Sequence, residues 1–240
     1  MRVLIVAPPK TGNSWLRCLF AILYDLEWLR DSPTERTPAA LAAWVAAGAY
    51  PDQSVFHKHY DYSSEFVAIV TAIPAHLATI LRDPYDQFVS LNFFVQTQAE
   101  AGLRKRDGAR GDTDRMIGKP IDHPEVMASL ADGFGSSLLK GIGWLESGRS
   151  VVIRYEALHA DPVAELTRAT DQIEPVPPEL VARAIAACQA ETMRQTHRGL
   201  HKRLRSATVG DWRNHLTEAH LAIFREHHAD AIRRLGYEVR

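Results

Sequence analysis

The chain has 240 residues, of which 46% are hydrophobic, so it can form a sizeable core, and a single domain over 1–240 is the simplest expectation. Its 28 basic and 29 acidic residues give a net charge of −1, which argues against binding to nucleic acid or to a membrane surface. No apolar run is long enough for a signal peptide or a transmembrane helix, so we expect a cytoplasmic protein.

The first predicted elements are a strand, a tight loop and a helix. Residues 2–7 are mostly β-branched or aliphatic and predict a buried strand, and from Trp15 onward the apolar residues recur at helical spacing. The loop between them, PPKTGNSW over 8–15, leaves backbone N–H groups without partners where the helix dipole is positive. This predicts an anion-binding site, to which Lys10 adds a full charge. The polar side chains that could donate to the anion or cap the helix are those of Thr11, Asn13 and Ser14.

Two other interpretations of this loop stay open. In the P-loop of nucleoside triphosphatases the lysine follows the last glycine, whereas Lys10 precedes Gly12, so the Walker pattern is not met. A small-molecule kinase of the P-loop type would need that lysine and an acidic residue for magnesium. The loop could also be an ordinary turn between a strand and a helix.

Short β-rich runs alternate with helical patterns along the rest of the chain, at residues 54–59, 77–81 and 150–154. This predicts an α/β domain with a central, mainly parallel sheet flanked by helices, with ligands bound beyond the carboxyl ends of the strands. The two cysteines, Cys18 and Cys188, fall in separate helical patterns far apart in the sequence. In a cytoplasmic protein we expect them to be reduced, packed thiols rather than a disulfide.

The segment after the third of these strands, RDPYDQFVSLNFF over 82–94, begins with an arginine and continues into a predicted helix. Arg82 and Ser90 would suit a phosphate, because guanidinium and hydroxyl groups both donate hydrogen bonds to its oxygens. Alternatively, Arg82 pairs with a nearby carboxylate and Ser90 is a packed small residue.

Two further segments follow. IRYEALHADP over 153–162 continues from the last predicted strand, and in it Asp161 can cap a helix that Pro162 begins. LRSATVGDWRNHLT over 204–217 stands near the C-terminus, and no rule of core packing requires this sequence.

Together these segments resemble the cytosolic-type sulfotransferases that use 3′-phosphoadenosine 5′-phosphosulfate (PAPS), and the chain is similar to a bacterial member of that family. The loop at 8–15 is similar to the family's PKSGTTW, and the segment at 82–94 to its RNPxDxxVS. The segments at 153–162 and 204–217 are similar to YEDMxxxP and RKGxxGDWK. The order and approximate spacing of the motifs also agree. The resemblance implies an α/β fold with a P-loop-like phosphosulfate-binding loop, and transfer without a metal that leaves the product PAP.

The resemblance also implies a role for each matching position. The residues that would hold the 5′-phosphosulfate are Lys10, Thr11, Gly12, Asn13, Ser14 and Trp15. Arg82 and Ser90 would bind the 3′-phosphate, and Tyr155 would lie near the adenine. The family's RKG is Arg205-Ser206-Ala207 here, so this cofactor-binding loop would bring Arg205 to the 3′-phosphate without the second cation or the glycine.

The general base is expected in SVFHKHYDY over 54–62. The family's second strand ends in KxH, which matches His57 and His59, and the resemblance assigns the acceptor proton to His59. Period-two alternation places both histidines on one side of the strand and Lys58 on the other. Histidine suits this role because its pKa lies near the operating pH. Two alternatives stay open. His57 could be the base instead, or both histidines could be surface residues of a polar turn with no catalytic role.

The acceptor is predicted only as a small molecule with a hydroxyl or an amine. Residues 96–123 are rich in glycine, proline and charge, and are expected to form a mobile lid over the acceptor or a solvated loop. Aromatic residues that could flank an apolar acceptor are Tyr60, Tyr62, Phe93 and Phe94. A catalytically silent nucleotide-binding module is the remaining alternative from outside the enzymes.

Overall fold

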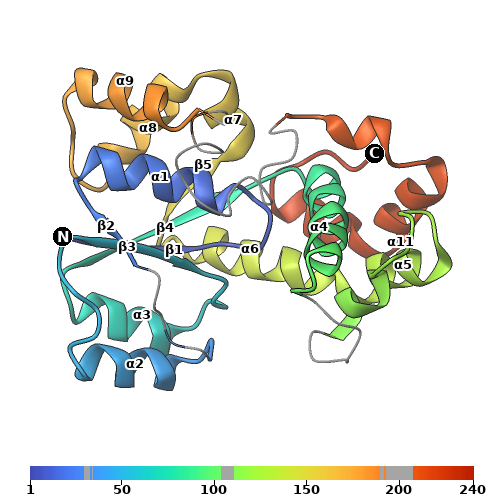
Figure 1. Cartoon of the computed structure of the whole chain (residues 1–240), viewed down its shortest axis with the longest axis horizontal. Helices are drawn as coiled ribbons and strands as arrows, with labels where there is room; N and C mark the ends of the chain where they lie inside the picture. Colours follow the sequence, from blue (N-terminus) through green and yellow to red (C-terminus); the bar gives the residue numbers. More distant parts are fainter. Residues whose placement is uncertain (30–32, 34, 104–110, 190–191, 193–207) are drawn as a thin grey trace.

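The computed structural model describes the chain except for residues 30–32, 34, 104–110, 190–191 and 193–207. Its centre is a five-stranded parallel sheet with the order β2-β3-β1-β4-β5 (Figure 1). The strands are β1 (Arg2–Val6), β2 (Glu27–Trp28), β3 (Ser54–Lys58), β4 (Ala75–Leu81) and β5 (Val151–Arg154). The predicted α/β class and parallel sheet are confirmed. The edge strand β2 was not predicted, because two residues are too few to show a periodic pattern.

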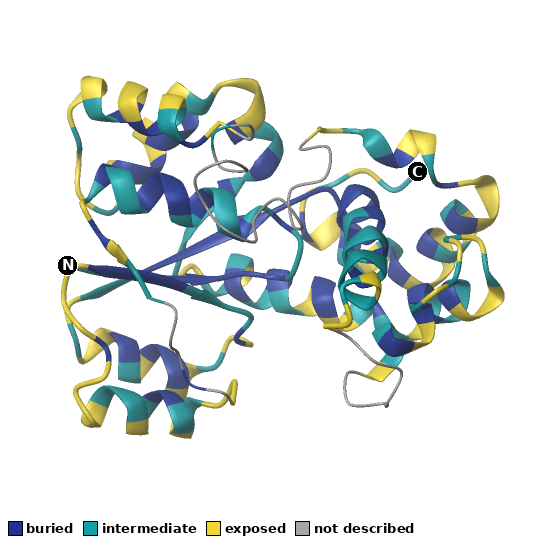
Figure 2. Cartoon of the chain, in the orientation of Figure 1, coloured by how far each residue is buried: buried dark blue, intermediate teal, exposed yellow. Residues whose placement is uncertain are grey.

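Helices cover both faces of the sheet (Figure 1). One face carries α1 (Asn13–Leu23), α8 (Pro162–Thr170) and α9 (Pro178–Ala187), and the other carries α2 (Pro38–Ala46) and α3 (Ser64–Thr71). In β1, Val3 and Ile5 belong to the core on the α1 face. Leu4 and Val6 belong to the core on the α2 and α3 face. This two-sided burial explains the apolar run of β1, which is buried from Val3 to Val6 (Figure 2).

A third cluster of helices lies beyond the carboxyl ends of the strands, on the right of Figure 1. It contains α4 (Pro84–Glu100), α5 (Pro124–Ala128), α6 (Gly135–Ser147) and α11 (Glu218–Arg234). A π-helical turn, η2 (Ser129–Gly133), joins α5 to α6. The ring of Phe134 packs edge-on against Phe88 of α4 and Phe224 of α11, with centroids 5.4 and 5.9 Å apart. These contacts hold the helices of the cluster together, and Leu81 at the end of β4 belongs to the same core.

The boundary after β5 forms as the sequence predicts. Helix α7 (Tyr155–Ala160) follows the strand at once. Asp161 then accepts a hydrogen bond of 3.0 Å from the backbone N–H of Ala164 and caps α8, which begins at Pro162.

The expectation of free thiols is wrong in the structure. Cys18 of α1 and Cys188, just after α9, form a disulfide with their Cα atoms 6.1 Å apart. Both side chains are buried in the core that α1 and α9 share. The sequence placed each cysteine in a helix, but the distance between them depends on the packing of those helices, which sequence separation does not reveal.

Residues 96–123 are only partly a loop. They include the end of α4 and a 3-10 helix, η1 (Gly111–Met116), and residues 104–110 lie outside the described part. The side chain of Gln96 donates to the carbonyls of Met116 and Lys119 (2.8 and 3.1 Å) and accepts from the N–H of Gly118 (2.8 Å). One glutamine therefore ties the second half of this segment to α4.

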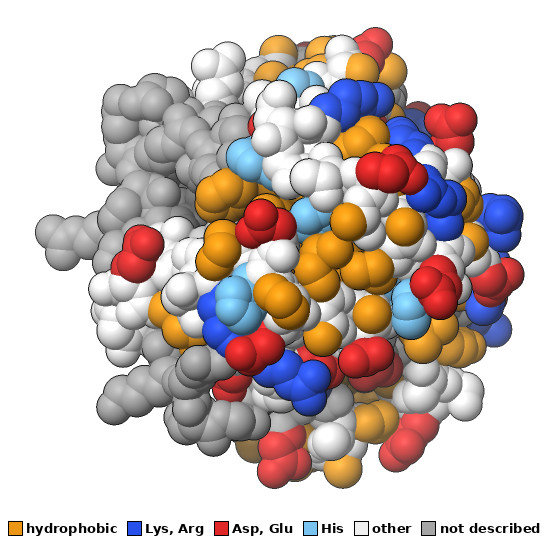
Figure 3. Space-filling view, turned by 90° about the vertical axis from the view of Figure 1, so that its right-hand side faces the viewer, with side chains coloured by type: hydrophobic (Ala, Val, Ile, Leu, Met, Phe, Trp, Pro, Cys, Tyr) orange, Lys and Arg blue, Asp and Glu red, His pale blue; other side chains and the backbone are white. Residues whose placement is uncertain are grey.

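Within the described residues no helix has the length and apolar character needed to cross a bilayer. On the face that carries α5 and α11, acidic and basic side chains are interspersed around a central area of hydrophobic side chains (Figure 3).

Candidate active site

The loop between β1 and α1 is closed by its own side chains. Thr11 Oγ1 and Asn13 Nδ2 both donate to the carbonyl of Pro8, at 2.9 and 2.8 Å. These side chains therefore stabilise the loop instead of capping α1, whose N-cap residue is Gly12. The first N–H groups of the helix, including those of Asn13 and Ser14, have no partner within the helix and are available to an anion.

Gly12 is required at its position. Its φ of +111° is a conformation that other residues rarely adopt. A Cβ there would also lie 2.8 Å from Cδ2 of Tyr155 and 3.1 Å from Cδ1 of Ile80. The loop glycine thus lets the Tyr155 ring approach the start of α1.

The ring of Tyr155 contacts two other predicted site residues, Trp15 and Arg82. Its ring is buried and contacts Trp15 edge-on, with centroids 5.7 Å apart. The guanidinium of Arg82 lies 4.3 Å from the centre of the same ring, a cation–π contact. The ends of β4 and β5 and the start of α1 therefore contribute to one location.

Arg82 is buried but incompletely paired. Nη2 donates to the carbonyl of Thr208 (3.0 Å), and Nη1 lies 3.5 Å from the carbonyl of Lys10. The nearest carboxylate oxygen, on Asp86, is 3.9 Å away, and Nε has no hydrogen-bond partner. The alternative from the sequence, in which Arg82 pairs with a carboxylate, therefore amounts to one long contact with Asp86. The guanidinium keeps N–H donors that an anionic ligand could use.

Asp86 is a residue that the sequence interpretation did not use. Its carboxylate is buried and accepts hydrogen bonds from the N–H groups of Gly210 and Trp212, at 2.7 and 2.9 Å. It thereby holds the chain at 208–212 beside Arg82. The signal was present in the sequence as the second aspartate of RDPYD, in a motif that the resemblance had already singled out.

The other predicted phosphate ligands are not brought to Arg82 by any contact in the described part of the chain. Ser90 is half-buried on α4, and no hydrogen bond joins it to Arg82. Arg205, Ser206 and Ala207 lie outside the described residues.

His59 lies at the carboxyl edge of the sheet. Because β1 and β3 pair with Val6 opposite Lys58, the next residues, Ala7 and His59, are also neighbours. His59 Nδ1 lies 2.7 Å from the carbonyl oxygen of Ala7. A carbonyl can only accept, so Nδ1 carries the proton and the lone pair is on Nε2. This is the tautomer that a general base acting through Nε2 requires.

The surroundings keep His59 neutral. Burial lowers its pKa to about 4, and the positive charges of Arg36, Lys140 and Lys10 act in the same direction against the hydrogen bond to Ala7. The ring of His57 is 5.9 Å away, on the same side of the strand, as the alternation predicts.

Lys10 lies next to one of the four aromatic residues expected around the acceptor. Its Nζ is 4.3 Å from the ring centre of Phe94. The other three are placed differently: Tyr60 is buried against Phe66, Tyr62 contacts Trp144, and Phe93 packs against His215. These contacts bring only Phe94 to the predicted catalytic lysine.

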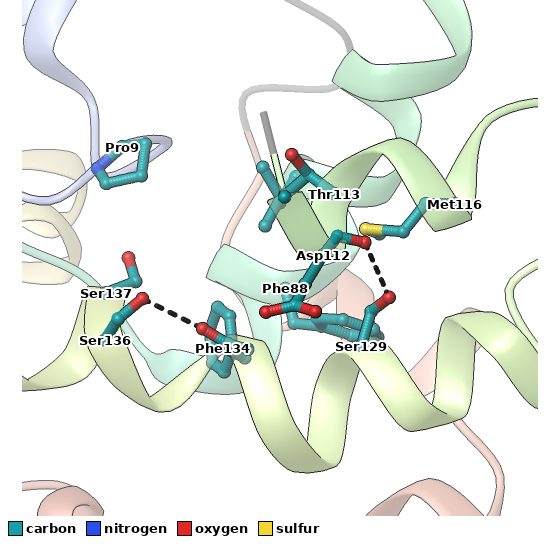
Figure 4. Close-up of a pocket in the computed structure, with 12 residues that line it drawn as sticks. Pro9, Phe88, Asp112, Thr113, Met116, Ser129, Phe134, Ser136 and Ser137 are labelled. Atoms are coloured by element: carbon teal, nitrogen blue, oxygen red, sulfur yellow. Dashed lines mark hydrogen bonds between the residues drawn. The ribbon is translucent and has the colours of Figure 1, made fainter. Parts of the chain in front are cut away.

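A pocket of about 260 Å³ lies beside the loop, between α4, η1 and the start of α6 (Figure 4). Pro9 of the loop and Phe88 of α4 border it. Gln87 Nε2 donates to the carbonyl of Pro9 and to Oγ of Ser137, both at 2.8 Å, and so joins the loop to the pocket wall. The sequence did not predict this pocket, because its walls come from segments far apart in the chain.

Comparison with protein families decides the relationship. A family model described as "Sulfotransferase domain" matches residues 1–236. The chain belongs to this sulfotransferase family. Comparison with curated protein sequences gave no match. Among the described residues, no group of three or more His, Cys, Asp or Glu side chains is arranged to hold a metal ion.

Solved sulfotransferase structures share the fold. The chain is similar to mouse sulfotransferase SULT7A1 complexed with PAP, with 19% identity and a TM-score of 0.71 over 97% of this chain and 84% of that one. It is also similar to retinol dehydratase in complex with androsterone and PAP, with 11% identity and a TM-score of 0.63 over 100% and 82%. A putative steroid sulphotransferase of Arabidopsis thaliana has 15% identity and a TM-score of 0.56 over 100% and 78%.

Proposed function

We propose that this sulfotransferase moves a sulfuryl group from PAPS to a hydroxyl, or an amine, of a small molecule. The observation that carries the proposal is the meeting of the loop at 8–15, Arg82 and Tyr155 beyond the ends of the strands, with His59 on the same edge of the sheet. Membership of the sulfotransferase family argues against the kinase alternative. Two similar structures are described with PAP, which is what remains of PAPS after transfer.

The residues present fit this nucleotide. The N-terminus of α1 and Lys10 offer N–H groups and a charge to the 5′-phosphosulfate, with Thr11, Asn13 and Ser14 in the same loop. The unpaired Nε of buried Arg82 is a donor suited to the 3′-phosphate, for which we also propose Ser90. The proposed contacts of Arg205, Ser206 and Ala207 lie outside the described part.

Aromatic side chains of the site suit the adenosine. Trp15 and Tyr155 form an edge-on pair at the start of α1, and Gly12 leaves room for the tyrosine. We therefore propose that Tyr155 lies near the adenine and that Trp15 belongs to the same nucleotide site.

Sulfuryl transfer needs a base for the acceptor proton, a positive charge beside the leaving oxygen, and alignment of the acceptor with the sulfur–oxygen bond that breaks. When bound, PAPS supplies an activated sulfuryl group whose sulfur–oxygen bond to the 5′-phosphate breaks as the acceptor oxygen bonds to sulfur. His59 Nε2 takes the proton of the acceptor hydroxyl, for which its neutral form is ready. Lys10 neutralises charge on the departing oxygen, and the N–H groups at the start of α1 hold the sulfuryl oxygens. No metal takes part in this scheme.

The acceptor is proposed as a small molecule. One similar protein, retinol dehydratase, is described with androsterone and with retinol. We propose that residues 96–123 border the acceptor site here, because η1 lines the pocket beside the loop. A cytoplasmic location and a lid-like movement of this segment remain predictions.

Calorimetric titration with PAP and with AMP tests the cofactor. Each charge-assisted hydrogen bond to the 3′-phosphate stabilises the complex by about 1.5–3 kcal/mol, so PAP should bind at least about tenfold more tightly than AMP. Equal affinities for PAP and AMP would contradict the assignment of PAPS as the cofactor.

An assay with labelled PAPS and a set of phenols, alcohols and amines tests transfer. Tight binding of PAP without transfer to any of them would favour the silent nucleotide-binding module.

A further inference from the structure

The pocket beside the phosphosulfate loop has a largely apolar surface and a single charged residue. Its apolar side chains are Pro9, Phe88, Leu91, Met116 and Phe134, of which Phe88, Met116 and Phe134 are buried. Hydroxyl side chains also line it, those of Thr113, Ser129, Ser136 and Ser137. Asp112 of η1 is the only charged residue among the 12 that line the pocket (Figure 4). An apolar pocket with few polar groups is typical of a small-molecule site, in which those groups decide specificity.

The Asp112 side chain is directed at the pocket wall. It lies directly on Gly133, where a Cβ would be 2.6 Å from Cβ and 2.7 Å from Oδ2 of the aspartate. Glycine at 133 thus makes room for the carboxylate. The backbone is also fixed, because Ser129 Oγ donates to the carbonyl of Asp112 at 2.8 Å. The carboxylate is therefore held at one place on the wall.

The carboxylate of Asp112 can still accept a hydrogen bond from a ligand. Its ion pair within the described residues is with Arg115, where Nη2 lies 3.4 Å from Oδ1. Both side chains are about half exposed, 52% for Arg115 and 41% for Asp112, so water screens the pair and it stabilises little. No described residue donates a hydrogen bond to Oδ2. An ammonium group in the pocket could make a charge-assisted hydrogen bond there.

The pocket also borders the loop that precedes α1. Pro9, on its border, precedes Lys10, and Gln87 fixes the distance between this loop and Ser137. Its volume of about 260 Å³ is near the lower end of ligand pockets, typically about 300–1,000 Å³. The occupant is therefore a compact molecule that reaches the loop with one end.

We propose that this pocket binds the acceptor and that Asp112 selects acceptors with a basic nitrogen. The preferred substrate is then a compact, largely apolar phenol or alcohol whose ammonium group pairs with Asp112 while its hydroxyl faces Lys10 and His59. The inference rests on the proposed sulfuryl transfer, and it adds the chemical class of the acceptor.

Matched acceptors that differ by one amino group test the proposal. Tyramine and 4-ethylphenol form a phenol pair, and 6-amino-1-hexanol and 1-hexanol form an alcohol pair. With PAPS at saturation and pH 7, kcat/KM should be about tenfold higher for the amine of each pair, mostly through a lower KM, and the product should be the O-sulfate. Equal or better use of the neutral members would overturn the proposal.

Substitution locates the preference. Asp112→Asn keeps the size of the side chain and removes its charge. The ratio of kcat/KM between the amine and the neutral member of each pair should therefore fall to about one, while kcat/KM for the neutral acceptors stays the same. Asp132→Asn is the matched control, because Asp132 is an exposed carboxylate of the adjoining turn η2 that does not line the pocket. An amine preference that survives Asp112→Asn, or is lost equally in Asp132→Asn, would contradict the role of Asp112.

Direct binding separates this inference from the proposed function. Tyramine and 4-ethylphenol are titrated into the protein with and without PAP, with no chemistry involved. If PAP does not bind, the proposed function fails, yet tyramine should still bind more tightly than 4-ethylphenol and lose this advantage in Asp112→Asn. If PAP binds and tyramine shows no advantage, or no binding at millimolar concentration, the acceptor inference fails alone.

Discussion

His59 gains its chemical character from one backbone contact and from its charged surroundings. The carbonyl of Ala7 fixes the proton on Nδ1, and burial with three neighbouring cations keeps the ring neutral. A pKa of about 4 makes the free imidazole a weak base, and the negative charges of bound PAPS would raise that pKa toward the working range. The proposed role of His59 as the base therefore depends on the charge of the bound nucleotide.

Replacing His59 by Ala should separate chemistry from binding. Loss of a general base costs about 10²–10⁴-fold in rate, so kcat with saturating PAPS should fall by that factor. The affinity for PAP should change little, because the imidazole is assigned to the acceptor. Steady-state kinetics together with calorimetry of PAP measure both quantities.

His57→Ala is the control for this prediction, since the two rings are 5.9 Å apart on the same side of the strand. It should cost much less in kcat. Full turnover in His59→Ala, combined with its loss in His57→Ala, would transfer the role of base to His57.

Lys10→Ala should weaken PAP binding and lower turnover together, because we assign that charge to the phosphosulfate in both the ground state and the transition state.

Among the elements, α4 organises most of the site. Its start follows Arg82, its first turns carry Asp86 and Gln87, and its half-buried Phe94 lies beside Lys10. Asp86 fixes the chain at 208–212, and Gln87 fixes the loop at 8–15. One helix therefore sets the relative positions of the nucleotide loop, the C-terminal segment and the pocket.

Asp86→Ala tests this role of α4. The change leaves the part-buried N–H of Gly210 and the buried N–H of Trp212 without an acceptor, which should lower the free energy of unfolding by about 2–4 kcal/mol. The affinity for PAP should fall about tenfold or more, because the segment beside Arg82 loses its anchor. Urea denaturation and calorimetry measure the two effects. Asp132→Ala, at an exposed carboxylate, should change neither; unchanged PAP affinity in Asp86→Ala would mean that this anchor does not serve the nucleotide site.

For the whole molecule, the disulfide joins regions that the sheet alone does not connect. Cys18 lies about one helical turn beyond the loop at 8–15, and Cys188 lies 170 residues later, after α9. A cross-link over so long a loop restricts the unfolded chain strongly. Disulfides persist in oxidising compartments, so this pairing is at odds with the cytoplasmic location expected from the sequence.

Reduction should therefore destabilise the protein. A native disulfide typically contributes about 2–4 kcal/mol, so dithiothreitol should lower Tm by several degrees. The double variant Cys18→Ala/Cys188→Ala should have the lower Tm with or without the reductant. Two reactive thiols in the untreated protein, counted after unfolding, would show instead that the cysteines are reduced, as the sequence predicted.

Sequence by itself determined the class of fold and the resemblance to sulfotransferases, and it predicted a phosphosulfate-binding loop over 8–15. These features are local: a buried strand shows in consecutive residues, Asp161 and Pro162 mark a helix start, and the loop chemistry around Lys10 and Gly12 is contiguous. Tertiary structure decided what depends on distance between remote segments. The disulfide between Cys18 and Cys188, the anchoring of 208–212 by Asp86 and the pocket of Asp112 all join parts of the chain whose approach is set by helix packing, on which local sequence patterns carry no information.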